Sequence, residues 1–429
     1  TTGTDEHGQK IADKADEKGE DRQAYVDHYA AEFSRLQESL NLSYDKFVRT
    51  TDEHHKRAAQ HIWKLCDEAG DIYKKKYQGL YCVGCESFKI DSDLVDGRCP
   101  DHPKMELQEI EEENYFFTLS KYQSYLEEYL STEGVIVPEH RRLEALKFVQ
   151  GGLEDLSISR QKERMDWGVP VPGDDEQVMY VWFDALTNYI STLGWPEDTN
   201  GLFETFWQSG ETLQFAGKDQ VRFQSIIWQA MLKSAGLKAT DQVFYHGFIN
   251  SGGQKMSKSL GNVISPYELI DRYGTDATRY LLLRHVHPTD DSDLTWERMD
   301  ELYTANLVNG LGNLTARIMK MCEQHLELGE FAPMDPTTLD VPELFNFQQA
   351  MDHIWSLISR ADEVITETEP FKLIKTEPEQ AKTILENLRA DLLHIGRLLL
   401  PAMPETSEKI RKAVRANTKP DNLFSRIES

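Results

Sequence analysis

The chain has 429 residues, 39% of them hydrophobic and 28% charged, and its formal net charge is −26 at pH 7. This length suffices for two to four domains with separate cores, and no apolar run is long enough to predict a transmembrane helix. Five cysteines are too few for a secreted disulfide framework, which favours a reducing, cytoplasmic compartment. Taken alone, the acidic balance argues against nucleic acid as a partner, because phosphate binding needs local lysine and arginine, and we expect no binding of DNA. A local basic patch can nevertheless coexist with an acidic whole.

The first 70 residues are mostly helical in pattern. Apolar side chains recur at helical spacing over residues 24–36 and again over residues 52–70, where Gly70 fits a C-cap. The opening residues, Thr1, Thr2 and Gly3, read like the end of a buried strand. We therefore expect an N-terminally incomplete piece of a longer protein.

Residues 71–175 differ in character and carry a cluster of cysteines. The spacing Cys82-x2-Cys85-x13-Cys99-x2-His102 makes two short chelating pairs. Three thiolates and one imidazole complete a tetrahedral Zn²⁺ shell with no open position, so these four residues predict a structural zinc site. The alternative, three buried thiols beside an unrelated histidine, is disfavoured by the paired spacings. An acidic run at residues 109–113 follows, and we expect helical structure from there to residue 134.

Residues 176–295 alternate strands with helices. Strands are predicted at residues 178–183, 213–217 and 242–249, and a helix at residues 223–233. This alternation indicates βαβ units and a parallel sheet. From residue 296 onward the pattern is helical throughout, and apolar stripes over residues 347–365 and 384–399 predict a helical bundle.

A glycine-rich loop with two lysines follows the third predicted strand. Gly252 and Gly253 precede the sequence KMSKS at residues 255–259, so Lys255 and Lys258 supply positive charge on a mobile backbone. Nucleotidyl transfer needs such charge where it develops on the phosphates. An isolated Lys-x-x-Lys pair is usually an exposed basic turn, but the full pentapeptide after two glycines and a strand is far more specific.

This pentapeptide resembles the KMSKS signature of class I aminoacyl-tRNA synthetases, and three further segments resemble methionyl-tRNA synthetases in family order. They are GTDEHG at residues 3–8, YVWFDALTNY at residues 180–189 and GKD at residues 217–219. The resemblance runs over nearly the whole chain. It implies an α/β Rossmann-type catalytic domain with a zinc-knuckle insertion, followed by an all-α anticodon-binding bundle. The implied divisions are residues 1–70 and 176–295 for the two catalytic parts, 71–175 for the insertion and 296–429 for the anticodon-binding domain.

The activity that the resemblance implies is methionine–tRNA ligation. L-Methionine and ATP, accompanied by Mg²⁺, would give methionyl-adenylate, and the methionyl group would pass to tRNA(Met). Asp5 would hold the substrate ammonium, Arg160 would neutralise Asp5 or phosphate, and aromatic faces would suit the polarisable thioether. The implied site residues are Asp5, Arg160, Trp182, Ala185, Tyr189 and Gln224 for methionine, Gly217, Asp219, His246 and Lys258 for ATP, and Lys255 with Lys258 for catalysis. Apart from the resemblance, these could be core aromatics, surface charges and a core histidine.

The segment at residues 306–317 reads as one helix and resembles the anticodon-recognition helix of the family. Asn309, Asn313 and Arg317 recur every four residues and would share a face, from which amide and guanidinium groups could bond to base edges. Phe371 stands where the family usually has tryptophan, and it would stack a base with less area. The alternative is a solvated polar helix and a core phenylalanine.

Two departures from the family pattern bear on activity. Gln224 stands where the family usually has histidine, and because an amide also donates and accepts hydrogen bonds, we expect a retuned pocket. The His-x-Gly-His signature does not occur in these residues, so we expect the chain alone to be inactive or nearly so. One rival function is a class I synthetase for leucine, isoleucine or valine, whose large editing domain would not fit in residues 71–175. Another is a non-catalytic tRNA-binding module, which the intact lysine loop disfavours.

Overall fold

The computed structural model of the chain describes residues 1–84, 87–89, 94–100, 102–256, 261–329 and 346–427. These residues form two compact units, one made of residues 1–37 and 42–245 and the other of residues 38–41 and 246–429. Each unit has its own hydrophobic core. The four-part division expected from the resemblance stays a prediction. In the described parts of the chain, no helix is both long and apolar enough to cross a membrane.

The first unit contains short parallel strand pairs. β1 (Thr2–Thr4) pairs with β2 (Phe47–Arg49), and β12 (Gln242–His246) lies between β6 (Ile136–Val137), to which it runs parallel, and β11 (Leu213–Gly217). Parallel strands need crossover connections, which here contain helices. β11 and β12 share a sheet, as expected for residues 176–295, and β12 has a parallel neighbour. The other strand expected there, at residues 178–183, lies instead in a separate antiparallel sheet, so the expectation of one parallel sheet was only partly right.

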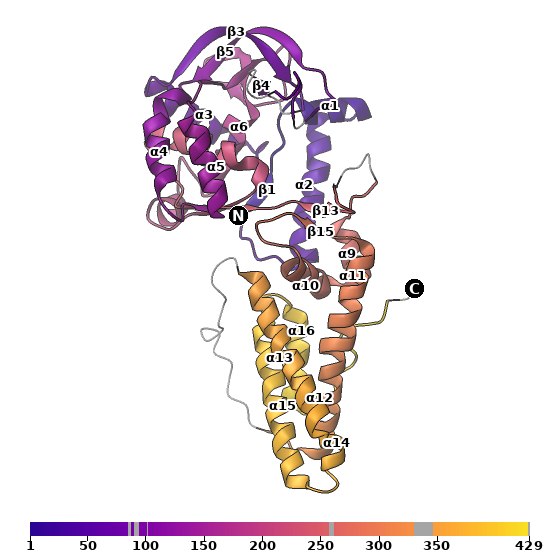
Figure 1. Ribbon diagram of the computed structural model, residues 1–429. Helices are drawn as coiled ribbons and strands as arrows, with labels where there is room; N and C mark the ends of the chain where they lie inside the picture. Colours follow the sequence, from indigo (N-terminus) through magenta and orange to yellow (C-terminus); the bar gives the residue numbers. More distant parts are fainter. Residues whose placement is uncertain (85–86, 90–93, 101, 257–260, 330–345, 428–429) are drawn as a thin grey trace. The chain divides into compact units, whose positions relative to one another are not determined.

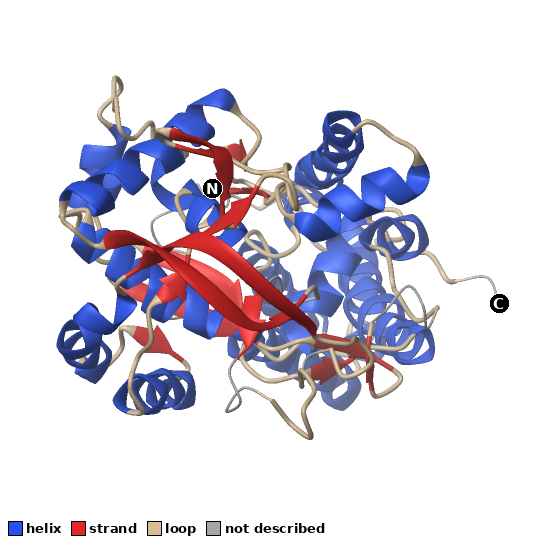
Figure 2. Cartoon of the chain, turned by 90° about the horizontal axis from the view of Figure 1, so that it is seen from above, coloured by secondary structure: helices blue, strands red, loops and turns tan. Residues whose placement is uncertain are grey.

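A long antiparallel ribbon projects from the same unit (Figures 1 and 2). β3 (Ile72–Cys82) pairs with β5 (Gln108–Phe117) along nearly its whole length, and β4 (Ser87–Lys89) and β7 (Leu156–Ser157) flank them. The acidic run at residues 109–113 lies within β5, where Glu113 faces Lys76 across the ribbon. The expectation that a helix begins directly after the acidic run was wrong, because cross-strand pairing with a lysine-rich strand extends β5 to Phe117.

Helices pack around these strands and close the core of the first unit. α3 (Glu53–Glu68), predicted over residues 52–70, buries Ala58 and Ile62 completely. The other helical elements of this unit are α1 (Gln9–Lys18), α2 (Arg22–Ser39), η2 (Leu119–Tyr122), α4 (Gln123–Ser131), α5 (Glu139–Gln150), α6 (Val181–Ala185), α7 (Asn188–Ser191), η3 (Glu204–Gln208), η4 (Lys218–Gln220), η5 (Phe223–Ile227) and α8 (Trp228–Ser234).

Two strand-to-helix connections carry the predicted pocket residues. The strand predicted at residues 178–183 ends earlier: β10 (Asp174–Met179), flanked by β8 (Ser159–Gln161) and β9 (Pro170–Val171), leads into α6. β11 has the predicted bounds, and the helix predicted at residues 223–233 is present, beginning with the π-helical turn η5. The third predicted strand ends at His246, and a Cβ at the next residue, Gly247, would overlap the backbone of Asp290.

The second unit begins with a small sheet and then becomes helical. β13 (Ile249–Ser251) pairs with β14 (Gln254–Lys255) and with β15 (Ser292–Asp293), and α9 (Pro266–Tyr273) and α10 (Thr275–His285) lie between β14 and β15 in the chain. A capping box starts α9: the Ser265 hydroxyl accepts from the Tyr267 amide, and the Glu268 carboxylate accepts from the Ser265 amide.

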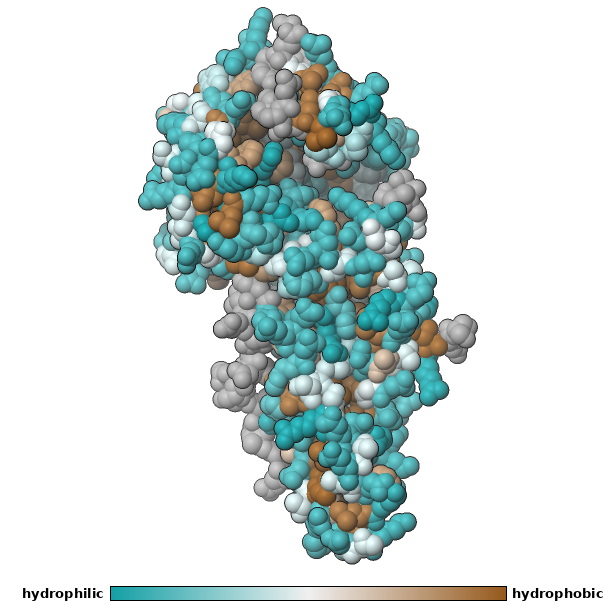
Figure 3. All heavy atoms as spheres, in the orientation of Figure 1, coloured by the Kyte–Doolittle hydropathy of each residue, from teal (hydrophilic) through white to brown (hydrophobic). Residues whose placement is uncertain are grey.

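The predicted helical bundle is present, with its long helices side by side in Figure 1. Nearly all of the two predicted apolar stripes is buried, Phe347 being an exposed exception. The visible outer face is largely hydrophilic (Figure 3), as expected of amphipathic helices. The helical elements of the bundle are α11 (Trp296–Leu302), η6 (Tyr303–Gly312), α12 (Asn313–His325), α13 (Phe347–Thr368), α14 (Pro370–Leu373), α15 (Pro378–Leu398) and α16 (Pro404–Ala416).

Candidate functional site

Tyr189 and Gln224 come from two different connections and meet inside the first unit. The Gln224 side-chain amide donates to the Tyr189 hydroxyl at 2.8 Å and to the Gln214 side-chain oxygen at 3.3 Å. Burial raises the pKa of Tyr189 to about 12, so its hydroxyl stays neutral at physiological pH. Gln224 is only 1% exposed, and among the described residues its side-chain oxygen has no hydrogen-bond partner. A free acceptor in a buried pocket can receive a ligand donor.

Aromatic rings line the same region. Trp182 stacks on Phe223 with ring centroids 4.1 Å apart and planes 23° from parallel. Ala185 is three residues beyond Trp182 on α6, and it is 5% exposed. Side chains three apart on a helix share a face. The structure therefore brings Trp182 next to the element that carries Gln224. Sequence reasoning missed Phe223 and Gln214, although Phe223 directly precedes a predicted site residue.

Asp5 and Arg160 are held in different surroundings. Asp5 follows β1 and is exposed, and its negative charge contributes to raising the pKa of both His7 and Tyr189, so it acts electrostatically on the predicted pocket. Arg160 on β8 is 3% exposed. Its guanidinium lies 4.7 Å from the Tyr180 ring centroid and donates to Ser159 O at 2.7 Å. Arg160 is thus a fixed, buried cation.

The predicted nucleotide residues of the first unit follow β11 directly. Gly217 ends the strand, and Asp219 lies in the short helix η4 with an exposed carboxylate that accepts from the Gln220 amide at 3.3 Å. Ligands of open α/β sheets bind beyond the carboxyl ends of the strands. Both residues stand at such an end.

The remaining predicted nucleotide residues belong to the second unit. His246 is exposed, and its Nδ1 donates to Gly247 O at 2.9 Å. Gly252 and Gly253, with φ of 65° and 71°, turn the chain between β13 and β14. Lys255 on β14 is exposed, with its ammonium 4.5 Å from the Phe248 ring centroid. Lys258 lies outside the described residues.

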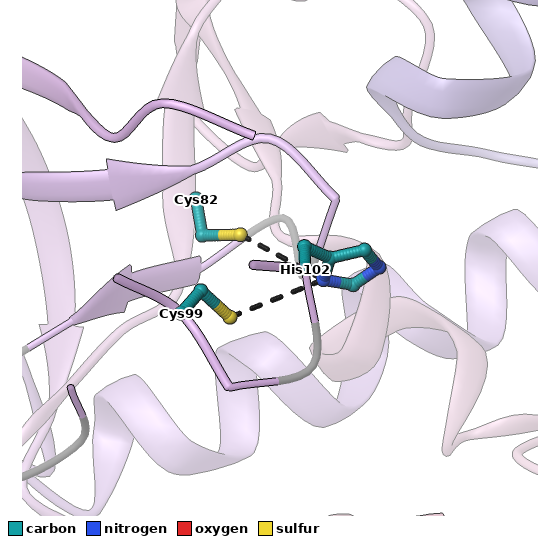
Figure 4. A group of neighbouring side chains, drawn as sticks. All are labelled: Cys82, Cys99 and His102. Carbon is teal, nitrogen blue, oxygen red and sulfur yellow. Dashed lines mark hydrogen bonds between the residues drawn. The ribbon is translucent and has the colours of Figure 1, made fainter. Parts of the chain in front are cut away.

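Three of the four predicted zinc ligands converge within the first unit (Figure 4). The Sγ atoms of Cys82 and Cys99 lie 3.8 and 4.0 Å from Nδ1 of His102, and the three ligand atoms are all within 4.8 Å of one another. Both thiols are fully buried. A Cβ at Gly84 would approach the His102 ring to 2.5 Å, so only glycine leaves room for this imidazole. Cys85 lies outside the described residues.

The predicted anticodon residues lie on the bundle, and the structure corrects their helix. Residues 303–312 are π-helical and α12 begins at Asn313, so the α-helical spacing argument applies to Asn313 and Arg317 and not to Asn309. Asn309 and Asn313 are exposed, and Arg317 forms an ion pair with Asp362 of α13. Phe371 on α14 is 47% exposed, which excludes a core position.

A group that sequence reasoning left without a role lies beside the pocket. Asp184, His7 and His55 form a buried hydrogen-bonded cluster. Two of these residues fall inside the segments that carry the family resemblance, but the sequence gives no sign that segments so far apart meet.

Comparison with known proteins gives a consistent result. The family of tRNA synthetases class I (M) matches residues 1–111 and 104–319. The methionine--tRNA ligase of Clostridium acetobutylicum is 42% identical over 430 residues, covering 96% of this chain and 66% of that protein. That of Caldanaerobacter subterraneus subsp. tengcongensis is 42% identical over 429 residues, covering 95% and 66%. This chain therefore spans just under two thirds of the length of these relatives.

A solved structure is similar over nearly the whole chain. It is the Mycobacterium tuberculosis methionyl-tRNA synthetase in complex with methionyl-adenylate, which superposes with a TM-score of 0.86 at 36% identity. The match covers 99% of this chain and 89% of that one.

Proposed function

This chain belongs to the methionyl-tRNA synthetases of class I, and on that premise we propose that it serves the ATP-dependent ligation of methionine to tRNA(Met). The observation that carries the proposal is the buried hydrogen bond from Gln224 to Tyr189, close to the stacked rings of Trp182 and Phe223. Such surroundings suit a neutral, polarisable side chain with a few fixed polar groups around it.

In the first proposed step, the methionine carboxylate attacks the α-phosphorus of ATP and pyrophosphate leaves. Asp5 binds the methionine ammonium, and Trp182, Ala185 and Tyr189 contact the thioether side chain. Arg160, buried against Tyr180, supplies fixed positive charge. Charge held in place before the reaction stabilises the transition state without reorganisation.

The proposed nucleotide-binding residues are those implied by the family resemblance. Gly217 and Asp219 would bind the ribose, His246 would contact the nucleotide, and Lys255 and Lys258 would stabilise the triphosphate, which Mg²⁺ would accompany. In the second step a terminal ribose hydroxyl of tRNA attacks the methionyl carbonyl, and AMP leaves. The parallel pairs β1–β2 and β6–β12 support a Rossmann-type catalytic domain.

A zinc ion would hold the insertion together. Cys82, Cys99 and His102 are spaced as ligands of one tetrahedral ion, and Cys85 is the fourth proposed ligand. The close approach of His102 to Gly84 supports this assignment, because a side chain at position 84 would collide with the imidazole that faces the two thiols. The ion would be structural, since four protein ligands leave no open position.

The bundle would bind the anticodon. Asn309, Asn313 and Phe371 are exposed and can reach unstacked bases, and Arg317 can exchange Asp362 for a base edge. Exposed aromatic rings stack bases at about 1–3 kcal/mol each.

The test is methionine-dependent exchange between ATP and pyrophosphate by the protein that contains these residues. We expect exchange with methionine and none above background with leucine, isoleucine or valine at equal concentration. Transfer of methionine to tRNA(Met) should follow with the same preparation. Exchange driven by another amino acid, or tRNA binding without any exchange, would overturn the proposal.

A further inference from the structure

A buried carboxylate lies between two histidines beside the proposed methionine site. Asp184 Oδ2 accepts a hydrogen bond from His7 Nδ1 at 2.6 Å, and Asp184 Oδ1 accepts one from His55 Nε2 at 2.7 Å. His55 Nδ1 lies 2.9 Å from the Ser191 hydroxyl. None of these four residues is more than 5% exposed. With its Nε2 proton directed at Asp184, His55 accepts from Ser191, so the network fixes its tautomer.

The cluster contains an ion pair away from water. Burial alone raises the pKa of Asp184, but the charge of His7 and the hydrogen bonds from His55 and His7 outweigh it, and the net pKa falls to about 2. Burial lowers the pKa of His7, but Asp184 outweighs it and the pKa is raised above its usual value. Asp5 raises it further and Lys56 lowers it. A buried ion pair is weak evidence of stabilisation, because apolar residues often serve as well, so a role in specifying geometry is the better account.

The cluster joins segments that carry the proposed methionine-binding residues. His7 is two residues beyond Asp5 on the connection after β1. Asp184 directly precedes Ala185 on α6. His55 is on α3, which packs against α6. A single carboxylate therefore ties the Asp5 connection, the pocket helix and the core helix to one another.

We propose that Asp184 is a positioning residue of the methionine site. By binding His7 and His55 at once, it holds the Asp5 connection against α6, so that the ammonium-binding carboxylate and the side-chain pocket meet the same ligand. It forms no bond to substrate and transfers no proton. The inference rests on the proposed function. A displacement of about 1 Å in such a site can cost roughly a hundredfold in rate.

The experiment compares two cluster variants with a control on a second buried carboxylate. Asp184→Asn removes the charge but keeps the size, and His7→Gln keeps a hydrogen-bond donor but removes the cation. Asp71→Asn is the control, because Asp71 is equally buried but bonds to Thr118, Tyr122 and Ser234. The measurements are the methionine Kd by calorimetry, the KM values for methionine and ATP in pyrophosphate exchange, and the Tm.

The expected result is a split between the two substrates. Asp184→Asn and His7→Gln should each raise the Kd and KM for methionine by about tenfold or more and leave the KM for ATP within about twofold. Asp71→Asn should lower Tm and leave the methionine Kd unchanged. If Asp184→Asn folds and its methionine Kd is within about threefold of that of the unaltered protein, this inference is wrong but the proposed function stands. If Asp184→Asn does not fold, the same thresholds apply to His7→Gln. If the unaltered protein binds no methionine, the proposed function itself is wrong.

A pH profile separates positioning from bulk stability. His7 binds Asp184, whose other oxygen binds His55, and Asp5 and Lys56 also act on the pKa of His7. Because the pKa of His7 is raised, the ion pair is complete below the usual histidine range and is lost as pH rises through the raised pKa. Methionine affinity of the unaltered protein should fall across that interval. The fall should be missing in His7→Gln, and its persistence there would contradict the proposed role.

Discussion

In the first unit, Gln224 and Tyr189 are buried and hydrogen-bonded to each other, with Trp182 stacked against a neighbouring ring. In the second unit, Lys255 and Asn313 are exposed on a hairpin and on a helix surface. The difference follows from the proposed ligands. A neutral side chain is recognised by shape and by dry polar contacts, which require a preformed pocket. Phosphates and bases are met by long or exposed polar groups that stay hydrated until binding.

The largest expected effect concerns the two lysines of the KMSKS segment. Lys258→Ala should lower the rate of methionyl-adenylate formation by about 10²–10³-fold, because one fixed charge on the transition state is lost. The KM for methionine should change little, since the buried pocket remains intact. Pyrophosphate exchange at varied methionine measures both, with Lys412→Ala on the bundle surface as the control. An equal loss in methionine affinity would break the distinction between the two regions.

A smaller effect is expected at the cluster of Cys82, Cys99 and His102, where Gly84 leaves room for the His102 ring. Gly84→Ala should weaken Zn²⁺ binding by about 10–100-fold, because the new methyl group displaces the His102 ring. Competition with a chromogenic chelator measures the affinity. Gly168→Ala is the matched control, since a Cβ there meets its neighbours at an ordinary 3.4 Å. Equal zinc affinity in the two variants would contradict the assignment of His102.

A substitution on the outer face of the bundle should weaken the binding of tRNA and leave the other steps unchanged. Arg317→Ala should raise the KM for tRNA(Met) by roughly tenfold, within the 1–3 kcal/mol of a lost arginine–base contact, and leave pyrophosphate exchange unchanged. Arg298→Ala removes another exposed, ion-paired arginine from the same unit and serves as the control. Matching effects of the two substitutions would indicate general electrostatics and not base recognition.

The smallest effect is expected inside the pocket. Gln224→His should keep methionine activation within about tenfold, roughly 1.4 kcal/mol, because an imidazole N–H can replace the amide that donates to Tyr189. The ratio of kcat to KM for methionine is the quantity to compare. A loss of several orders of magnitude would mean that the amide does more than hold the tyrosine.

Local elements of this fold could be predicted where the pattern was strong. β11 has its predicted bounds, and α3 and the buried stripes of the bundle follow from apolar periodicity. The strand predicted over residues 242–249 ends at His246, directly before Gly247, where the backbone of Asp290 approaches closely. The π-helical stretch before Asn313 could not be told from an α-helix in the sequence, because its side chains follow an ordinary helical pattern.

The sequence proposes members of the candidate site but says nothing of the contacts between them. Motifs pointed to Tyr189 and Gln224, yet only the structure joins them by a hydrogen bond. The pairing of Arg317 with Asp362 depends on helix packing across 45 positions. Likewise, His7 lay inside a recognised segment, but its partner Asp184 is 177 residues away. Periodicity reports local faces and cannot report such distant contacts.

The Asp184 cluster has a consequence for how the insertion can vary. His55 and Asp184 are 129 residues apart, and the whole of residues 71–175 lies between them. Closing a chain loop costs entropy that grows only with the logarithm of its length, about 0.6 kcal/mol for each doubling. Lengthening or trimming the intervening segment should therefore cost the cluster little stability, which leaves that segment free to diverge while the residues on either side of it stay in register.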